Sequence, residues 1–308
     1  IEHIGYTQNF INDTFVELNF IADIRSNERL RDVELIIKID TPARNKLMIV
    51  KTSLDTGRRR ITTTMHLENP RRWWCNGLGE PSMYTVDFRL IYKHNDLDQR
   101  SMNIGIRSLD LIREKDSIGE SFYFKLNGKK GFAKGANVIP FDNFLPRVKT
   151  DTYRQMVKNA KDANMNMLRV WGGGVYGEDA FYEECDKQGI MVWQDFMFAC
   201  AMYPGDESFL QNVEIEAEEN VKKISQHPSI ALWCGNNENS EGWERWGWKE
   251  GQSPANKDYL EKAYTKVFNE ILPTAVKNWG KNVPYWESSP KFGRGDIRHR
   301  FEGDAHYW

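Results

Sequence analysis

The chain of 308 residues carries 42 lysines and arginines against 44 aspartates and glutamates, so its formal net charge of −2 gives no basis for binding nucleic acid. No run of about 18 apolar residues occurs, which excludes a membrane-spanning helix within these residues. The length suffices for two ordinary domains, or for one large α/β domain with an appendage.

The first part of the chain, to about residue 110, alternates apolar and polar residues with a period of two. The stretches Phe15 to Ile21, Val33 to Ile39 and Tyr84 to Leu90 follow this pattern and are separated by turn-forming residues. Short strands with one polar face and no convincing helix among them predict a small antiparallel β-sandwich with a structural role.

From about residue 118 the pattern changes to alternating strands and helices, which predicts a parallel sheet. The expected strands are Phe132 to Pro140, Met165 to Trp171, Ile190 to Asp195, the buried run from Ser229 to Gly235, and Pro284 to Ser289. Four helices are expected between these strands. The first begins at a cap formed by Thr150 or Asp151, and the second runs from Asp179 to near Gly189. The third carries Val213, Ala217, Val221 and Ile224 on one face, and the fourth lies within Pro254 to Asn278.

The residues that follow these strands favour a barrel over an open nucleotide-binding sheet. Neither G-x-G-x-x-G nor G-x-x-x-x-G-K-S/T occurs. Polar and aromatic side chains instead converge from several strand ends, as in a (β/α)8 barrel. They are Arg169, Trp171, Asp195, Asn237, Glu238 and Glu287. Five clear units and a sixth around His306 are expected, so we predict an incomplete barrel.

Glu238 is the leading candidate for chemistry because it follows a strand that is apolar on both faces. Glycoside hydrolysis needs two carboxyl groups, one of them a protonated acid at the leaving oxygen. We expect burial near aromatic residues to raise the pKa of Glu238. The alternatives are that Glu238 caps the following segment or is solvated.

The neighbouring candidates each have a structural alternative. Asn237 is suited to bind a sugar hydroxyl, or to cap a turn. Arg169 is suited to hold a carboxylate ionised, or to form an ordinary buried salt bridge. Trp171 and Trp246 are suited to stack on a sugar, although a single tryptophan more often packs in a core or loop.

The remaining titratable residues give weaker indications. Asp195 and Glu287 also stand at expected strand ends and are candidates for the second carboxylate. His227 is expected to be a helix cap or a surface residue. His299 and His306 are not near other ligand types in the sequence, and no zinc-binding spacing or G-x-S-x-G motif occurs.

The chain contains four cysteines and 11 tryptophans. The cysteines lack C-x-x-C spacing, so we expect buried thiols rather than disulfides or a zinc site. They are Cys75, Cys185, Cys200 and Cys234. Tryptophan placed at strand ends often stacks on sugar rings, so the high aromatic content favours a carbohydrate ligand.

Several motifs together resemble the β-mannosidase branch of glycoside hydrolase family two. They are Trp171 to Tyr176, Met191 to Phe198, His227 to Ile230 leading into Gly235 to Asn239, Gly105 to Arg107, Asn127 to Lys129, Lys134 to Asn137, and Trp73-Trp74 with Asn76-Gly77. The resemblance implies an immunoglobulin-like β-sandwich over residues 1–112. It also implies, over residues 113–308, the N-terminal portion of a (β/α)8 catalytic barrel, with about strands one to six.

The resemblance further implies a retaining hydrolase that removes terminal non-reducing β-D-mannose residues. It assigns Glu238 as general acid/base, Asn237 as the amide that contacts the sugar 2-hydroxyl, and Arg169 as support for the nucleophile. Trp171 and Trp246 match aromatic residues of the mannose pocket. The family's nucleophile is a glutamate near the seventh strand, and no position here matches it, so we expect the chain alone to be inactive.

The sequence leaves other properties as expectations. The expected substrate is a β-mannoside oligosaccharide or glycan. We expect no cofactor, no metal and no nucleic-acid partner. Asp195 is a further expected substrate-binding residue. An open barrel edge predicts homodimerisation, domain swapping or poor solubility. Because the first residue is Ile1, we expect the natural start to lie upstream; the resemblance implies a periplasmic, secreted or lysosomal protein. The alternatives are a family-two hydrolase acting on another sugar, such as an exo-β-glucosaminidase or an endo-β-mannosidase, and a non-catalytic sugar-binding module.

Overall fold

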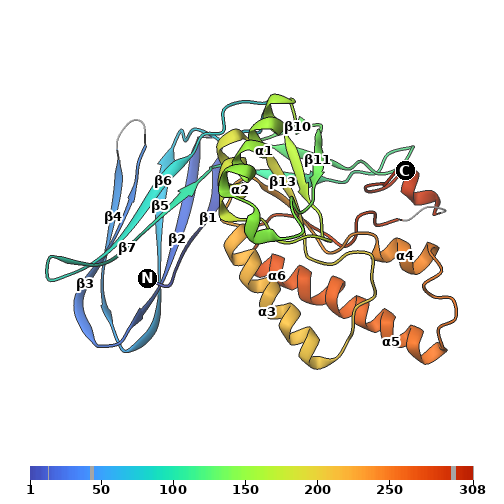
Figure 1. The fold of residues 1–308 in the computed structure, drawn as a ribbon. Helices are drawn as coiled ribbons and strands as arrows, with labels where there is room; N and C mark the ends of the chain where they lie inside the picture. Colours follow the sequence, from blue (N-terminus) through green and yellow to red (C-terminus); the bar gives the residue numbers. More distant parts are fainter. Residues whose placement is uncertain (13, 42–44, 293–295, 308) are drawn as a thin grey trace. The chain divides into compact units, whose positions relative to one another are not determined.

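The computed structural model describes residues 1–12, 14–41, 45–292 and 296–307. The chain divides into two compact units (Figure 1). The first consists of Ile1–Trp73 with Ser82–Ile106, and the second of Trp74–Pro81 with Arg107–Trp308.

The first unit is built from two antiparallel sheets. One has the order β1-β2-β5 and the other the order β4-β3-β6-β7. The strands are β1 (His3–Asn12), β2 (Phe15–Ser26), β3 (Leu30–Ile39), β4 (Lys46–Leu54), β5 (Gly57–Glu68), β6 (Tyr84–Tyr92) and β7 (Asn95–Ile104). The three stretches with period-two alternation therefore lie in strands, as predicted.

A single apolar core fills the first unit and joins its two sheets. Every second residue of β2 is buried, including Leu18 and Phe20, because successive side chains point to opposite faces of a strand. Leu35 and Phe88 reach the same core from the other sheet. The rings of Phe20 and Phe88 meet edge to face at 5.8 Å, which makes the unit a two-layer sandwich.

The second unit is organised around a five-stranded parallel sheet of order β11-β12-β13-β14-β15. Its strands are β11 (Gly135–Val138), β12 (Met167–Val170), β13 (Met191–Asp195), β14 (Ile230–Cys234) and β15 (Tyr285–Trp286). The five predicted strands are thus confirmed, with shorter bounds. A separate antiparallel sheet contains β8 (Leu109–Ile112), β9 (Tyr123–Leu126) and β10 (Lys129–Gly131).

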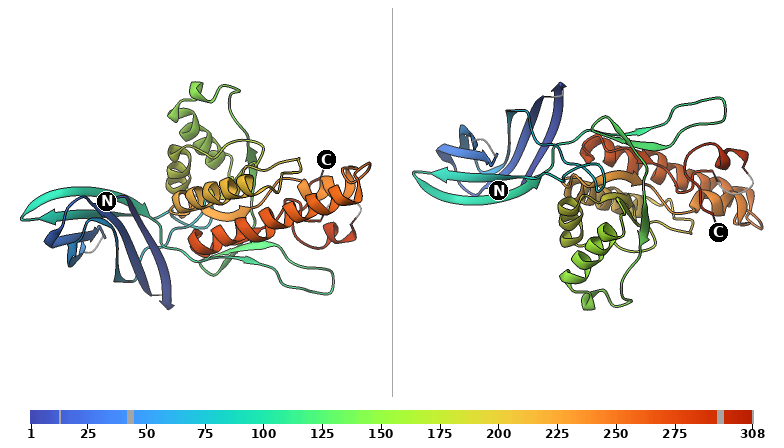
Figure 2. Two further views of the ribbon diagram at one scale, coloured as in Figure 1. Left: turned by 90° about the horizontal axis from the view of Figure 1, so that it is seen from below. Right: turned by 90° about the horizontal axis from the view of Figure 1, so that it is seen from above.

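Helices connect and cover the parallel strands. They are α1 (Thr150–Asp162), α2 (Asp179–Gln188), α3 (Glu207–Ile224), α4 (Asn239–Arg245), α5 (Pro254–Tyr264) and α6 (Leu272–Trp279), with short 3₁₀ helices at Leu145–Arg147 and Ile297–Arg300. Helices α3 and α6 pack side by side (Figure 2). None of the helices in the described part of the chain has the length and hydropathy needed to cross a bilayer.

Two local expectations about these helices are corrected. The residue at the N-cap of α1 is Lys149, whose side chain makes no capping bond, so neither Thr150 nor Asp151 caps this helix. The long helix expected within Pro254 to Asn278 contains a π-helical stretch, Thr265–Ile271, between α5 and α6. Periodicity of apolar residues does not distinguish such a stretch from an α-helix.

The core of the second unit surrounds β14, whose five residues are all buried. The predicted face of α3 contributes Val213, Ala217, Val221 and Ile224 to this core. Three of the four cysteines are buried, but Cys200 is exposed, so the prediction of a buried thiol is wrong there. Cys200 lies in the segment after β13 with a φ of 48°.

Gly189 ends α2 and generates the first prediction. It adopts a left-handed conformation with φ 71°, and a Cβ atom there would lie 2.9 Å from the Trp74 carbonyl oxygen. We expect Gly189→Ala to lower the free energy of unfolding by about 2 kcal/mol, measured by urea denaturation.

The matched control is Gly128→Ala in the β9–β10 turn. Gly128 has φ 81°, but a Cβ atom there would meet nothing within 4 Å. This variant therefore carries the conformational cost without the clash. Equal losses in the two variants would show that the contact with Trp74 is unimportant.

Candidate functional site

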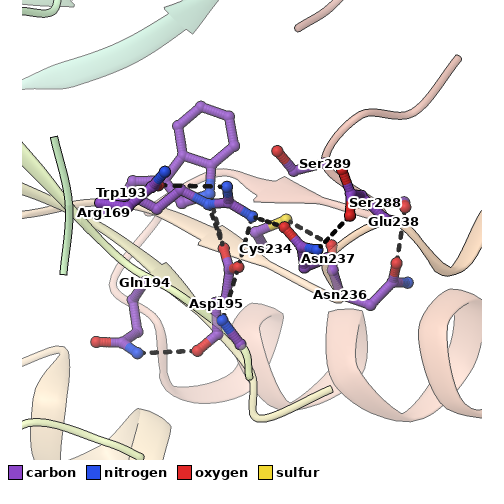
Figure 3. A network of polar contacts seen from close by, with 12 residues as sticks. Arg169, Trp193, Gln194, Asp195, Cys234, Asn236, Asn237, Glu238, Ser288 and Ser289 are labelled. Carbon is purple, nitrogen blue, oxygen red and sulfur yellow. Dashed lines mark hydrogen bonds and ion pairs between the residues drawn. The ribbon is translucent and has the colours of Figure 1, made fainter. Parts of the chain in front are cut away.

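The candidate site forms where the parallel strands of the second unit end, as Figure 3 shows. Parallel pairing places Arg169 of β12 between Asn137 of β11 and Trp193 of β13. It also places Asp195, the last residue of β13, beside Cys234, the last residue of β14. Carboxyl ends of parallel strands share one edge of the sheet, so the polar residues that follow them gather there.

Arg169 and Asp195 form a buried ion pair at this edge. The Nη2 and Nε atoms of Arg169 lie 2.7 and 3.2 Å from the two carboxylate oxygens of Asp195. Asp195 is completely buried and also accepts hydrogen bonds from Trp193 Nε1 and the Gly172 amide, each at 3.0 Å. Burial lowers the pKa of Arg169, but Asp195 outweighs that effect and raises it above its ordinary value. Arg169 is therefore a fixed cation.

Arg169 also orients Asn237. Its Nη2 atom donates to Asn237 Oδ1 at 2.9 Å. A guanidinium has no acceptor, so the oxygen of the amide must face it and the nitrogen must face away. That nitrogen lies 3.0 Å from Glu238 Oε2. The orientation of Asn237 follows from this chain of contacts.

The backbone at Glu238 is left-handed, with φ 63°, and the residue occupies the N-cap position of α4. Its side chain nevertheless makes no capping hydrogen bond, and only 4% of the residue is exposed. Both structural alternatives for Glu238, a cap and a solvated residue, are therefore excluded. A strained non-glycine conformation of this kind is common at functional sites.

Three side chains hold the carboxyl group of Glu238. Oε1 lies 2.8 Å from His306 Nδ1, while Oε2 accepts from Asn237 Nδ2 at 3.0 Å and from Cys200 Sγ at 3.5 Å. Although Cys200 is an exposed residue, partial burial of its thiol raises the pKa of that thiol, and the hydrogen bond and charge of Glu238 act in the same direction. The thiol therefore stays protonated and donates to Glu238. His306 in turn lies 3.1 Å from Ser289 Oγ.

The expectation for the pKa of Glu238 is wrong in direction. Burial on its own raises this pKa, as expected. The hydrogen bond and charge of His306, together with hydrogen bonds from Cys200 and Asn237, outweigh burial and bring the pKa below the ordinary 4.5. The sequence could not show this because His306 lies 68 positions away and reaches Glu238 only through the fold.

The structure also corrects the interpretation of the histidines. His227 is neither a cap nor a surface residue, since its Nδ1 lies 2.6 Å from Asp186 in a pair with both side chains largely buried. Asp186 also accepts from the Ser229 amide and so joins α2 to the start of β14. The described residues around His306 include no sixth strand. His299 contacts the Asp296 backbone, outside the site.

The remaining predicted residues lie in different surroundings. Glu287 Oε1 accepts from Tyr264 at 2.9 Å, and its Oε2 lies 3.8 Å from Lys291 Nζ. Trp171 is half-buried, and Trp246 is 42% exposed with its ring against Trp248. Among the described contacts, none joins either tryptophan directly to Glu238.

Two tryptophans that are not among the predicted site residues also lie at the sheet edge where the parallel strands end. Trp193 donates to Asp195, and Trp286 donates to Asp304 at 2.7 Å. Phe122 lies between them, with ring centroids 6.2 Å from Trp193 and 4.9 Å from Trp286. Their positions on the strands β13 and β15 are the signal that could have identified them.

The Arg169–Asp195 pair generates a stability prediction. Arg169→Met leaves the Asp195 carboxylate buried without its cation, so we expect a loss of about 3 to 5 kcal/mol in the free energy of unfolding. Addition of Asp195→Asn should recover part of this loss. Arg154→Met, which breaks the exposed contact with Asp151, is the control and should cost under about 1 kcal/mol. Similar losses from the two single variants would contradict the importance of the buried pair.

The contact between His306 and Glu238 generates a pH prediction. His306→Gln removes the charge and leaves burial opposed only by Cys200 and Asn237, so the pKa of Glu238 should rise. Carboxyl ¹³C NMR, with Glu238→Gln for assignment, measures the change, and His299→Gln is the control. A lowered carboxyl pKa stabilises the fold above its unfolded value of about 4.5, and this contribution is lost as pH falls through the folded pKa. His306→Gln should therefore destabilise the chain more at neutral than at acid pH; an unchanged Glu238 pKa would contradict the role assigned to His306.

Comparison with known proteins relates this chain to a family of glycosyl hydrolases. Residues 1–107 match the family Glycosyl hydrolases family 2. The chain is 38% identical over 269 residues to the β-mannosidase of Bos taurus, covering 87% of this chain and 28% of that protein. It is 37% identical over 246 residues to β-mannosidase B of Aspergillus terreus, covering 79% of this chain and 29% of the relative.

Solved structures show the same relationship. The β-D-mannosidase of Dictyoglomus thermophilum aligns with all of this chain and 37% of its own, at 38% identity and a TM-score of 0.89. The β-glucuronidase of Bacteroides uniformis, at 19% identity and a TM-score of 0.76, shares the fold. The chain thus spans less than a third of the curated relatives named here. Its motif-based resemblance to the β-mannosidase branch of glycoside hydrolase family two is confirmed.

Proposed function

We propose that this chain contributes the acid/base half of a retaining glycoside hydrolase that removes terminal non-reducing β-D-mannose residues. The observation that carries the proposal is the Glu238 carboxyl group, buried at the strand ends and held by Asn237 and His306. The similarity to proteins named β-mannosidase supports mannose as the sugar.

In this mechanism Glu238 acts twice on the substrate. It first gives a proton to the glycosidic oxygen as the bond to the anomeric carbon breaks, and it then takes a proton from the water that releases the sugar. Asn237 lies beside it, and we propose that it contacts the 2-hydroxyl of the mannose. Trp171, Trp246 and Arg169 remain proposed substrate-binding residues.

We assign no nucleophile in this chain. Asp195 is unsuited to attack because Arg169, Trp193 and the Gly172 amide already occupy its oxygens. We propose instead that Asp195 supports substrate binding through Arg169. A retaining mechanism requires a second carboxyl group about 5 to 5.5 Å from the first. We therefore propose that these 308 residues alone do not turn over a glycoside.

The finer architecture is also a proposal. We propose that residues 113–308 form about six units of a (β/α)8 barrel and that residues 1–112 form an immunoglobulin-like sandwich. The alignment with a β-mannosidase structure over 100% of this chain supports this division. The edge strand β11 is mostly exposed, which leaves its outer side available for a further strand or for a second copy of the chain.

The test uses the full-length protein that contains this chain. Glu238→Ala should slow hydrolysis of mannosides with poor leaving groups by about 100- to 10,000-fold, and activated aryl mannosides far less, because activated groups leave without a proton. Glu244→Ala, at an exposed position of α4, is the control. Equal losses on both kinds of substrate would reject the acid/base role. A preference for p-nitrophenyl glucosaminide or galactoside over mannoside would reject the assigned sugar.

A further inference from the structure

We propose that Asp304, Ser289 and His306 form a hydrogen-bonded relay that fixes the tautomer of His306, so that its Nδ1 shares a single proton with Glu238. The relay is a feature of the geometry. Its consequence for catalysis rests on the proposed function of Glu238.

The relay begins with a hydroxyl that has only one proton to give. Ser289 is 2% exposed, and its Oγ donates to Asp304 Oδ2 at 2.6 Å. An ionised carboxylate is an acceptor only, so the Ser289 proton is committed to Asp304. Ser289 Oγ therefore presents a lone pair to His306 Nε2, 3.1 Å away, and Nε2 must carry a proton.

Asp304 is itself held as an acceptor. Its Oδ1 receives the indole N–H of Trp286 at 2.7 Å and the Lys291 amide at 3.4 Å. Each carboxylate oxygen thus faces donors, which fixes the direction of the whole chain. The donors on the Oδ1 side leave Oδ2 for Ser289.

The protonated Nε2 determines what Nδ1 can do. When His306 is neutral, Nδ1 has a lone pair, so the proton in the 2.8 Å contact belongs to Glu238 Oε1. When His306 is charged, the same proton lies on Nδ1 and Glu238 is a carboxylate. Glu238 Oε2 already accepts from Asn237 and Cys200, which leaves Oε1 for the shared proton.

The relay makes Glu238 and His306, together called the pair, hold the proton between them more tightly than they would without Ser289. Removal of that proton leaves the Nδ1 lone pair facing a carboxylate, an arrangement with no donor between two acceptors. Without Ser289, the ring could move its remaining proton to Nδ1 and satisfy the carboxylate. Titratable or charged groups that the described contacts place around Glu238 and His306 include Cys200 at Oε2, Asp304 behind Ser289, and Arg169 behind Asn237.

In the proposed reaction the proton balance is simple. The proton shared by Glu238 and His306 passes to the glycosidic oxygen, which also receives the electrons of the breaking bond, so the alcohol leaves neutral. In the same step the second carboxylate, which we assign to no residue of this chain, bonds to the anomeric carbon as nucleophile. The pair then carries one more negative charge. Water restores the proton when its hydroxyl adds to the anomeric carbon and releases the nucleophile. His306, Ser289 and Asp304 act through Glu238 and are positioning residues.

Imidazole ¹⁵N NMR of this chain tests the relay without any activity assay. His306, assigned with His306→Gln, should show a protonated Nε2 and an unprotonated Nδ1 whenever its ring is neutral. Ser289→Ala should give a mixture of tautomers, and Ser289→Thr should restore the single one. Ser288→Ala is the matched control, since Ser288 is equally buried but bonds to Asn236.

Asp304→Asn gives the sharpest outcome. Trp286 and Lys291 require an acceptor, so the amide oxygen should turn to them and the amide nitrogen to Ser289. The Ser289 proton is then no longer committed to position 304, so we expect it to turn to His306 Nε2 and the tautomer to invert to Nδ1–H. An Nδ1–H ring in the unaltered chain, or an unchanged tautomer in a folded Ser289→Ala variant, would overturn the proposal.

A second arm tests the catalytic consequence in the full-length protein. The basic limb of the kcat/KM profile should move to lower pH in Ser289→Ala and stay in place in Ser288→Ala. If Ser289→Ala changes the His306 tautomer but leaves the basic limb of the kcat/KM profile in place, the consequence for catalysis is overturned and the relay itself is not. Absence of hydrolysis of every β-mannoside by the unaltered protein would reject the proposed function and leave the NMR result standing.

Discussion

The ion pair between Arg169 and Asp195 is the interaction on which the arrangement of the site depends. A guanidinium can only donate hydrogen bonds, so each side chain that hydrogen-bonds to Arg169 must turn an acceptor atom towards it. Asp195 does so from β13 and Asn237 does so from the segment after β14. The orientation of the Asn237 amide is thereby fixed, and its nitrogen is directed at Glu238 Oε2. A lysine would supply the charge without the two-sided geometry, because only the planar guanidinium donates in fixed directions to both partners.

A second directional chain meets the same carboxyl group from the opposite oxygen. It runs from Asp304 through Ser289 and His306 to Glu238 Oε1. Each oxygen of Glu238 thus joins a different series of hydrogen bonds, and the carboxyl group has little freedom to rotate. A left-handed backbone at Glu238 is consistent with this, since such a conformation persists where the surroundings determine it. Rigid placement of a proton donor reduces the cost of orienting it during a reaction.

The sequence predicts the framework of this site well and its electrostatics poorly. The apolar run at Ile230 to Cys234 predicts a central strand of the sheet, because a strand buried on both faces consists of apolar residues throughout. The position of Glu238 follows from that run. The sign of its pKa shift does not, because burial is visible in composition while the opposing contact with His306 exists only in the folded chain. The prediction of a buried thiol at Cys200 is wrong for a similar reason: a cysteine is usually buried, but this residue is exposed beside Glu238, a contact that exists only in the folded chain.

The two hydrogen-bonded chains meet because the backbones after β14 and β15 approach each other closely. Gly235 donates its amide to the Trp286 carbonyl at 2.8 Å, and a Cβ atom at this position would collide with the Glu287 backbone and the Tyr285 hydroxyl. The approach continues as Asn237 pairs with Ser289 and the Glu238 amide donates to the Ser289 carbonyl at 3.0 Å. Ser289 and Glu238 are therefore neighbours through main-chain contacts before their side chains interact. Gly235, directly after the buried strand β14, thus allows the close backbone approach that brings Ser289 and the proposed proton donor Glu238 together.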